Sequence, residues 1–387
     1  MWLAGSLHPA PHRVPHRPAP TRRWSPVLDA PSFPASRLDA LATRIGRLVG
    51  ADDQDTVIVP GEAIVALEAV ALELGHKRQR VLNLATSHYG LLFDEWLRRN
   101  GASVTTIEPT RRGGAIDPAV VEAALRDGTF TALSLVHGEG ATGIVNPLKR
   151  LLAIASASGV VTLVDAVASV GAEPIDVTAL GADIVVVGPQ KGWAGPSGVS
   201  AVVIGERGWA ALERPAGATS LSSVSLLDLR RDWIDTDRTV IPGTPLTLEL
   251  WALDEAVSRV EAEGSDALVA RHRTAAGATW QAIRALGLEP WAADVASASG
   301  LVTGLLLPDG VDRAAILTAT ARYGAALTAG VGPVPANHVR LNHTGARAAF
   351  GPIVADLAAL ASALTAAGVR VDIAASIAAL SEADWSR

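Results

Sequence analysis

Two residues of this sequence combine a reactive side chain with a position just after an apolar strand. Asp165 ends the run at 160–164, and Lys191 follows the run at 183–187 after a short Gly-Pro-Gln segment. Open α/β sheets bind ligands at the carboxyl ends of their strands, so both side chains are expected at one edge of a sheet. Each also has an ordinary interpretation: Asp165 caps the following turn, and Lys191 is a surface lysine.

Lysines are few in this chain, which narrows the candidates for amine chemistry. Of its 387 residues, 33 are Lys or Arg, and only three of these are lysines: Lys77, Lys149 and Lys191. Lys77 lies in a polar turn and Lys149 near a helix start, where solvated charges are usual. A lysine forms a Schiff base with an aldehyde cofactor, and a carboxylate keeps a pyridine nitrogen protonated. Lys191 and Asp165 together therefore predict a pyridoxal phosphate site.

A phosphate site is predicted where strand 56–59 meets a helix expected over 62–74. The segment 60–63 (Pro-Gly-Glu-Ala) stands at this junction, and the amides and dipole at a helix N-terminus attract anions. Glu62 would repel a phosphate if its side chain turned inward. Its carboxylate is therefore expected to point away.

Alternating strands and helices would position these residues. β-Branched runs predict strands at 56–59, 81–85, 103–107, 131–136, 160–164, 183–187 and 199–204. Strands that are apolar throughout are typical of a largely parallel sheet covered by helices on both faces. Proline at a first helical position predicts helix starts at Asp117-Pro118 and Asn146-Pro147.

The pattern changes after residue 245. Helices are expected at 246–262, 266–286, 312–322 and 352–367, with strand-like stretches at 300–307 and 337–342. We therefore expect an α/β fold in three parts. These are an extended Pro-rich arm at 1–35, a large domain at 36–245 and a smaller α+β domain at 246–387.

Composition excludes several classes of function. The chain has no cysteine, which rules out disulfides, thiolate metal sites and a cysteine nucleophile. Its net charge of −6 comes without an acidic or basic block, so neither nucleic acid nor an anionic membrane is an expected partner. No apolar run reaches the roughly 18 residues of a membrane helix, and no signal peptide is recognised. A cytoplasmic protein is expected.

A third motif runs from His137 to Leu148 and reads His-Gly-Glu, Thr-Gly and Asn-Pro-Leu in order. Its glycines allow the backbone to approach a ligand closely. His137 and Glu139 have no third ligand nearby, so no metal site is expected.

Taken together, these motifs resemble the class V pyridoxal-phosphate-dependent aminotransferases, in particular the alanine/serine–glyoxylate and ureidoglycine–glyoxylate branch. The stretch 137–148 is similar to that branch's His-Gly-Glu-x-x-Thr-Gly signature, 164–169 to its cofactor-aspartate strand, and 190–198 to its Schiff-base segment. The resemblance covers about residues 55–260 and is looser towards the C-terminus. It implies a fold-type I enzyme with a mostly parallel seven-stranded sheet, pyridoxal 5′-phosphate as cofactor and a homodimer.

The resemblance also implies roles for single residues. Lys191 would form the Schiff base with the cofactor and carry the proton during transfer, and Arg340 would clamp the substrate carboxylate. The cofactor would be held by Gly61, Glu62 and Ala63 through backbone amides at the phosphate, Tyr89 and Val167 on the two ring faces, Asp165 at the ring nitrogen, Thr142, Gln190, and Thr244 of the other subunit. From the residues alone, Tyr89 could equally be a core tyrosine, Thr244 the N-cap of helix 246–262, and Arg340 a surface arginine.

The implied activity moves an amino group from a small amino acid to glyoxylate or another 2-oxo acid. The family often has Ser or Thr where Ala63, Gly140 and Ala141 stand, and a His where Gly243 stands, so the donor and acceptor stay open. The alternative is a pyridoxal phosphate lyase or a carbon–carbon-forming biosynthetic enzyme. A cysteine desulfurase is excluded by the absence of cysteine.

Overall fold

The fold is described from a computed structural model, over residues 31–76, 78–213, 222–243 and 245–386. Seven strands form one sheet in the order β1-β7-β6-β5-β4-β2-β3. They are β1 (Asp55–Pro60), β2 (Arg80–Leu84), β3 (Ser103–Ile107), β4 (Ala132–Val136), β5 (Val161–Asp165), β6 (Ile184–Val187) and β7 (Val199–Ile204). Only β7 runs antiparallel to its neighbours, whereas β2 to β6 pair in parallel. The mostly parallel seven-stranded sheet is thus confirmed, with bounds close to those expected.

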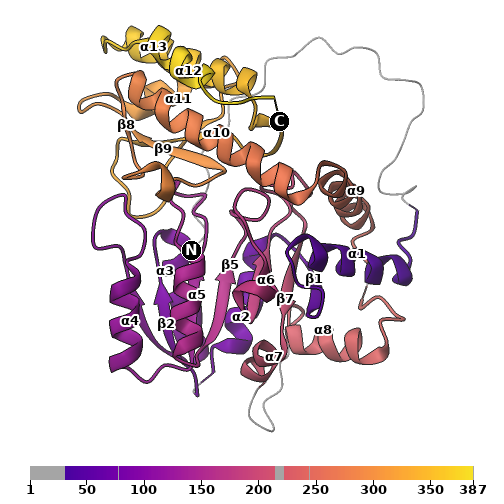
Figure 1. The fold of residues 1–387 in the computed structure, drawn as a ribbon. Coiled ribbons are helices and arrows are strands. Elements are labelled where there is room, and N and C mark those ends of the chain that lie inside the picture. Colours follow the sequence, from indigo (N-terminus) through magenta and orange to yellow (C-terminus); the bar gives the residue numbers. More distant parts are fainter. Residues whose placement is uncertain (1–30, 77, 214–221, 244, 387) are drawn as a thin grey trace. The chain divides into compact units, whose positions relative to one another are not determined.

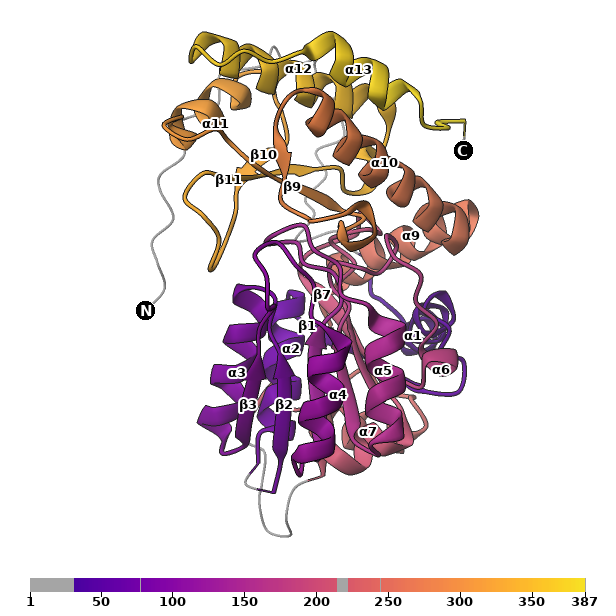
Figure 2. The ribbon, with the colours of Figure 1, turned by 60° about the vertical axis from the view of Figure 1, so that its left-hand side comes forward.

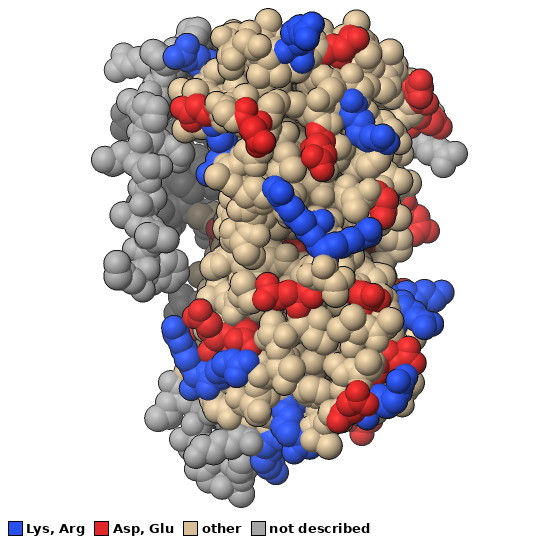
Figure 3. Space-filling view, turned by 90° about the vertical axis from the view of Figure 1, so that its left-hand side faces the viewer, with Lys and Arg blue, Asp and Glu red and all other residues tan. Residues whose placement is uncertain are grey.

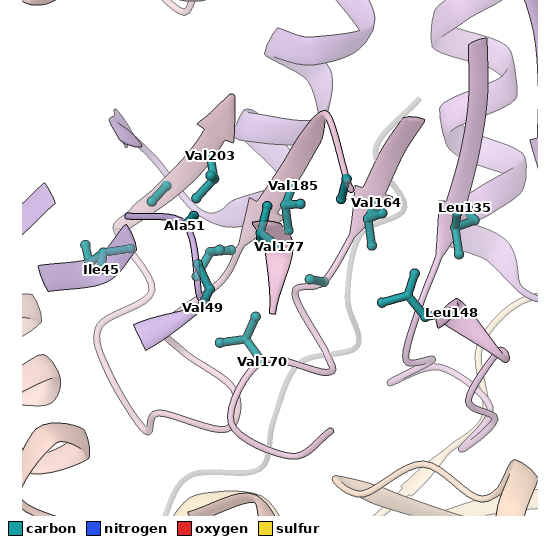
Figure 4. Close-up of a cluster of buried hydrophobic side chains, with 14 of the residues drawn as sticks. Ile45, Val49, Ala51, Leu135, Leu148, Val164, Val170, Val177, Val185 and Val203 are labelled. Carbon is teal, nitrogen blue, oxygen red and sulfur yellow. The ribbon is translucent and has the colours of Figure 1, made fainter. Parts of the chain in front are cut away.

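Both faces of this sheet are buried because alternate residues of each apolar strand point to opposite sides. Val81 packs in the cluster under one set of helices, and Leu82 and Leu84 pack in the cluster under the other. The first set comprises α2 (Ala63–Leu74), α3 (His88–Asn100), α7 (Glu206–Leu212) and α8 (Leu226–Asp232). The second set comprises α1 (Ala35–Leu48), α4 (Pro118–Asp127), α5 (Leu148–Ala157), α6 (Val177–Leu180) and α9 (Thr247–Glu263). Figure 4 shows part of this second cluster, where Val164, Val185 and Val203 of the sheet meet Ile45 and Val177.

A second, four-stranded antiparallel sheet follows in the order β10-β11-β9-β8. Its strands are β8 (Glu289–Pro290), β9 (Val302–Leu306), β10 (Leu327–Ala329) and β11 (His338–Asn342). The helices that share its core are α10 (Ser265–Ala285), α11 (Arg313–Ala321), α12 (Phe350–Ala366) and α13 (Ile373–Ser381) (Figure 2). Short 3₁₀ turns lie at Ile234–Thr236, Val295–Ser297 and Gly345–Arg347.

Main-chain hydrogen bonds connect the glycine-rich segment after β4 to this second part. The Val145 amide donates to the Ser297 carbonyl at 2.9 Å, the Ser299 amide to the Gly143 carbonyl at 2.9 Å, and the Val331 amide to Ala141 at 3.4 Å. The segment 140–145 therefore belongs to both parts of the chain. This arrangement brings β11 close to the carboxyl ends of the parallel strands.

Several local expectations are corrected by the structure. Tyr89, expected in a loop, lies in the first turn of α3. Helix α9 begins at Thr247 after Leu246, one residue beyond the expected start. Asn146 does not cap α5; its side chain donates to the Val136 carbonyl and accepts from the Ile116 amide.

The domain boundary at residue 245 stays a prediction, because residues 33–387 form one compact unit by their contacts. Most of the predicted arm, up to residue 30, lies outside the described residues. In the part of the chain that is described, no helix has the length and apolarity needed to cross a membrane. On the face in Figure 3, basic and acidic side chains are interspersed rather than gathered by sign.

Candidate active site

A cavity of about 190 Å³ lies where the parallel strands of the large sheet end. It brings the two residues of the first motif together, because Asp165 ends β5 and Lys191 follows β6. Its lining comes from the start of α2 and α3 and from the loops after β4, β5 and β6: Glu62, Ile64, Leu67, Tyr89, Val136, Gly138, Gly140, Asp165, Val167, Ala168 and Lys191. The apolar members Ile64, Leu67, Val136 and Ala168 were not singled out from the sequence. Ile64 and Leu67 are three residues apart on α2 and so lie on one face of the helix, and this spacing is the sequence signal that could have identified them.

Asp165 is a buried carboxylate aimed into this cavity. Its side chain is only 8% exposed, and its Oδ1 accepts a hydrogen bond from the Val167 amide at 3.0 Å. Burial raises the pKa of the carboxyl to about 6, and the nearby Glu62 adds to this, whereas the Val167 hydrogen bond and Lys191 oppose it. The residue caps its turn and also lines the cavity, so both interpretations hold.

Lys191 is placed by a tight turn that follows β6. The Ala194 amide donates to the Lys191 carbonyl at 2.9 Å, and the Gly195 amide donates to Pro189 at 2.8 Å. A Cβ atom added to Gly140 would stand 4.0 Å from the Lys191 Nζ. The absence of a side chain at Gly140 therefore keeps the space beside the amine open.

Glu62 does not point away from the predicted phosphate site, which corrects the expectation. It is the N-cap residue of α2, and its Oε2 accepts a hydrogen bond from the Ile64 amide at 2.9 Å. Its Oε1 accepts one from the Nε2 of Gln190. The expectation failed because the carboxylate satisfies an otherwise unpaired amide of the first helical turn.

Two of the remaining groups predicted at the phosphate are occupied, whereas the Ala63 amide has no main-chain hydrogen-bond partner among the described residues. The Gly61 amide donates to the Gly198 carbonyl at 2.9 Å, and so is already bound within the sheet. Ala63 is buried, at 1% exposure, and carries no hydroxyl. The Gln190 amide is held by Glu62. Thr244 lies outside the described residues, and its role stays a prediction.

Tyr89 lines the cavity, and Arg340 lies close enough to interact electrostatically with Tyr89. Tyr89 is 36% exposed, and burial and then the charge of Glu62 raise the pKa of its hydroxyl. Arg340, on β11, donates from Nε to the Ala329 carbonyl at 2.9 Å and from Nη1 to the Gly140 carbonyl at 2.5 Å. Burial lowers the pKa of the Arg340 guanidinium. Within the described ranges this guanidinium forms no ion pair with a carboxylate, so its charge is available to an anion.

Thr142, like Gly61, Ala63, Gln190 and Arg340, is a predicted site residue that does not line the cavity. Its side chain is 2% exposed, and its hydroxyl has no hydrogen-bond partner among the described residues. It packs instead against the second sheet, where a Cβ at Gly304 would stand 2.3 Å from its carbonyl oxygen.

A second buried carboxylate lies behind the cavity. Glu139 is fully buried and accepts hydrogen bonds from the Thr86 hydroxyl at 2.5 Å and from the Ser87 hydroxyl. Ser87 in turn caps α3 by accepting from the Tyr89 amide at 3.3 Å. Burial raises the pKa of Glu139 to about 7, against the opposing effect of the two hydroxyls. No cluster of three or more metal-binding side chains occurs among the described residues.

Comparison with known proteins decides the family. A family model described as aminotransferase class-V matches residues 35–356. The chain belongs to the class V aminotransferases. It is 35% identical over 319 residues to a pyridoxamine–pyruvate transaminase of Mesorhizobium japonicum, covering 82% of this chain and 80% of the relative. It is 28% identical to a serine–glyoxylate aminotransferase of Methylorubrum extorquens, over 77% and 76% of the two chains.

Solved structures agree with this assignment. The pyridoxamine–pyruvate aminotransferase of Mesorhizobium loti superimposes with a TM-score of 0.84 at 32% identity, over 90% of this chain and 88% of the other. The ureidoglycine–glyoxylate aminotransferase of Bacillus subtilis has the same fold, with a TM-score of 0.80 at 23% identity over 90% and 89%. The fold-type I architecture predicted from the sequence is confirmed. The chain is an aminotransferase of a pyridoxal-phosphate-dependent class, and the predicted cofactor is that of this class.

The residues present fit the two ends of this cofactor unequally. At the ring end, the buried Asp165 carboxylate suits a cationic ring nitrogen, Val167 offers an apolar face, and Lys191 offers an amine. At the phosphate end, the carboxylate of Glu62 occupies the helix N-terminus. The residues there do not fit a phosphate dianion.

Proposed function

We propose that Lys191 and Asp165 carry out amino transfer in this cavity, with a small 2-oxo acid as the acceptor. The Mesorhizobium relative is named for pyruvate and the Methylorubrum relative for glyoxylate, and both of these are small 2-oxo acids. The observation that supports the proposal most directly is the single cavity shared by Lys191, Asp165 and Val167. The two names differ in the amino donor, which is pyridoxamine in one and serine in the other.

Each residue has a distinct part in this proposal. When bound, a pyridine aldehyde or amine supplies the electron-withdrawing ring that makes the neighbouring carbon acidic. Lys191 moves the proton between the two carbons that exchange the amino group. Asp165 holds the positive charge on the ring nitrogen, and Val167 and Tyr89 hold the ring between them. Arg340 binds the carboxylate of the acid through charge-assisted hydrogen bonds, and so fixes its reacting carbon beside Lys191.

Replacement of the lysine tests this assignment. Lys191→Ala should abolish formation of alanine from pyruvate, because no other amine lines the cavity in the described part of the chain. Lys149→Ala, on α5, is the matched control and should transfer amino groups normally. Borohydride reduction in the presence of pyridoxal, followed by peptide mapping, should label Lys191. Label on Lys149 or Lys77, or full activity of Lys191→Ala, would overturn the assignment.

We further propose a cytoplasmic homodimer whose active sites lie near the subunit interface. The family resemblance supports this, since it implies that Thr244 serves the site of the other subunit. Sedimentation velocity of the active enzyme tests the dimer, and an active monomer would refute it. Fractionation of cells that produce the protein tests its location.

A further inference from the structure

The carboxylate of Glu62 occupies the position at which a phosphate would bind at the start of α2. One carboxylate oxygen accepts from the Ile64 amide at 2.9 Å, and the other accepts from the side-chain amide of Gln190. The positive end of a helix dipole and its unpaired amides favour one negative group. In this protein a side chain of the chain itself supplies that group.

Apart from the Ala63 amide, the groups near this position are already bound or carry no polar side chain. The Ser200 hydroxyl donates to the Gly61 carbonyl at 3.0 Å, the Gly61 amide is bound to Gly198, and Ala63 has no polar side chain. Among the described residues, Lys191 is the one Lys or Arg that lines the cavity. A phosphate monoester carries a charge of roughly −1.5 to −2 at neutral pH. It would therefore meet the Glu62 carboxylate, and Lys191 is the one cation of the described cavity lining that could offset the two negative groups.

The charge of Glu62 extends into the rest of the cavity. It adds to the effect of burial in raising the pKa of Asp165 and of Tyr89. A phosphate would place a third anion beside Glu62 and Asp165, at the cost of like-charge repulsion. A hydroxymethyl group in the same place carries no charge. It also has a proton to donate, and an ionised carboxylate only accepts hydrogen bonds.

We infer that this cavity binds a pyridoxamine or pyridoxal ring without a phosphate, whose hydroxymethyl group donates a hydrogen bond to Glu62. The inference rests on the amino transfer proposed for Lys191 and identifies the amino donor as the ring amine itself. The ring compound is then an exchangeable substrate, released as the aldehyde after each transfer. Glu62 is the residue that sets this specificity.

The net exchange is balanced without any further reactant. The aminomethyl carbon of pyridoxamine loses two electrons and becomes the aldehyde carbon, and C2 of the 2-oxo acid gains two electrons and becomes the amine-bearing carbon. The nitrogen passes from the ring compound to the acid. The keto oxygen leaves as water when the nitrogen binds C2, and a second water molecule supplies the oxygen of the released aldehyde. Lys191 carries the proton from the first carbon to the second.

Binding measurements on the full chain test this without relying on turnover. Calorimetric titration should show pyridoxamine binding roughly 100-fold more tightly than pyridoxamine 5′-phosphate, the scale of a like-charge contact in a partly desolvated site. Glu62→Ser removes the charge but keeps a good N-cap residue, and should lower this preference by about tenfold or more. Glu62→Gln, of the same size as the native residue, should act in the same direction. Glu68→Gln, at an exposed position of the same helix, is the matched control and should keep the native preference.

The possible outcomes separate the inference from the proposed function. Tighter binding of the phosphate ester by the native chain, or an unchanged preference in both folded Glu62 variants, would overturn the inference. Amino transfer to pyruvate with a bound phosphate ester would then still support the proposed function. Conversely, the native chain could prefer pyridoxamine and yet form no alanine from pyruvate with any amino donor. That result would support the selectivity for the ring without a phosphate and refute the proposed function.

Discussion

Replacing Glu139 by glutamine should stabilise this protein more at pH 8 than at pH 5. The Glu139 carboxyl is fully buried behind the cavity, and burial raises its pKa from the ordinary 4.5 to about 7. Between these two values the unfolded chain has released the proton while the folded chain still holds it, so the free energy of unfolding falls as pH rises. Above pH 7 the loss is complete. At about 1.4 kcal/mol per pKa unit, it amounts to about 3 kcal/mol.

Glutamine has the shape of the protonated carboxyl and does not titrate. The variant should therefore be close to the native protein in stability at pH 5, and more stable by about 3 kcal/mol at pH 8. Urea unfolding of both proteins at pH 5, 6.5 and 8 measures the difference, and the shared titrations of other groups cancel from it. Glu122→Gln, which alters an exposed ion pair with Arg126, is the control and should change stability by less than about 1 kcal/mol at every pH. A difference between Glu139→Gln and the native protein that does not grow with pH would refute the reasoning.

Four further predictions concern the site and the packing around it. Arg340→Ala should raise the KM for pyruvate by roughly 30-fold or more with little change in pyridoxamine affinity; an unchanged KM in steady-state assays would place the acid elsewhere. Asp165→Asn should lower kcat by roughly 100-fold, the equivalent of two pKa units at the ring nitrogen. Binding of pyridoxamine to the native chain should weaken as the pH falls through the Asp165 pKa of about 6, because the carboxyl becomes neutral; a flat titration would exclude this role. Gly90→Ala should lower the free energy of unfolding by about 1–3 kcal/mol, since a Cβ there would stand 2.7 Å from the Ala85 Cα. By contrast, Gly351→Ala, with nothing within 4 Å, should be neutral or stabilising, and equal thermal denaturation of these two variants would contradict the packing argument.

The strands and most long helices were predictable because their signals are local. Apolar β-branched runs gave β1 to β7 to within a residue or so, and Asp117 caps α4 as expected, accepting from the Ala119 amide at 2.9 Å. Because parallel strands end at the same edge of the sheet, Asp165 after β5 and Lys191 after β6 could be predicted to share one cavity. This followed from topology alone.

The predictions that were wrong concern close packing and the direction of side chains, which residue type and spacing do not report. Gly90 suggested a loop around Tyr89, yet its role is to let α3 approach Ala85 closely. Asn146 looked like a helix cap, yet its side chain ties the end of β4 to the loop at Ile116. The direction of the Glu62 side chain depended on whether its carboxylate accepts a hydrogen bond from an amide of its own helix or from solvent. No sequence spacing reports that choice.

The main-chain bonds at segment 140–145 bear on how substrates enter. A hinge rotation of the four-stranded part would break the Val145–Ser297, Ser299–Gly143 and Val331–Ala141 bonds together, and with them the contact of Arg340 with the Gly140 carbonyl. Rotation of one side chain at the rim, the 36%-exposed Tyr89, breaks none of them. We therefore expect substrates to enter by rotation of the Tyr89 side chain, while Arg340 keeps its position relative to Lys191.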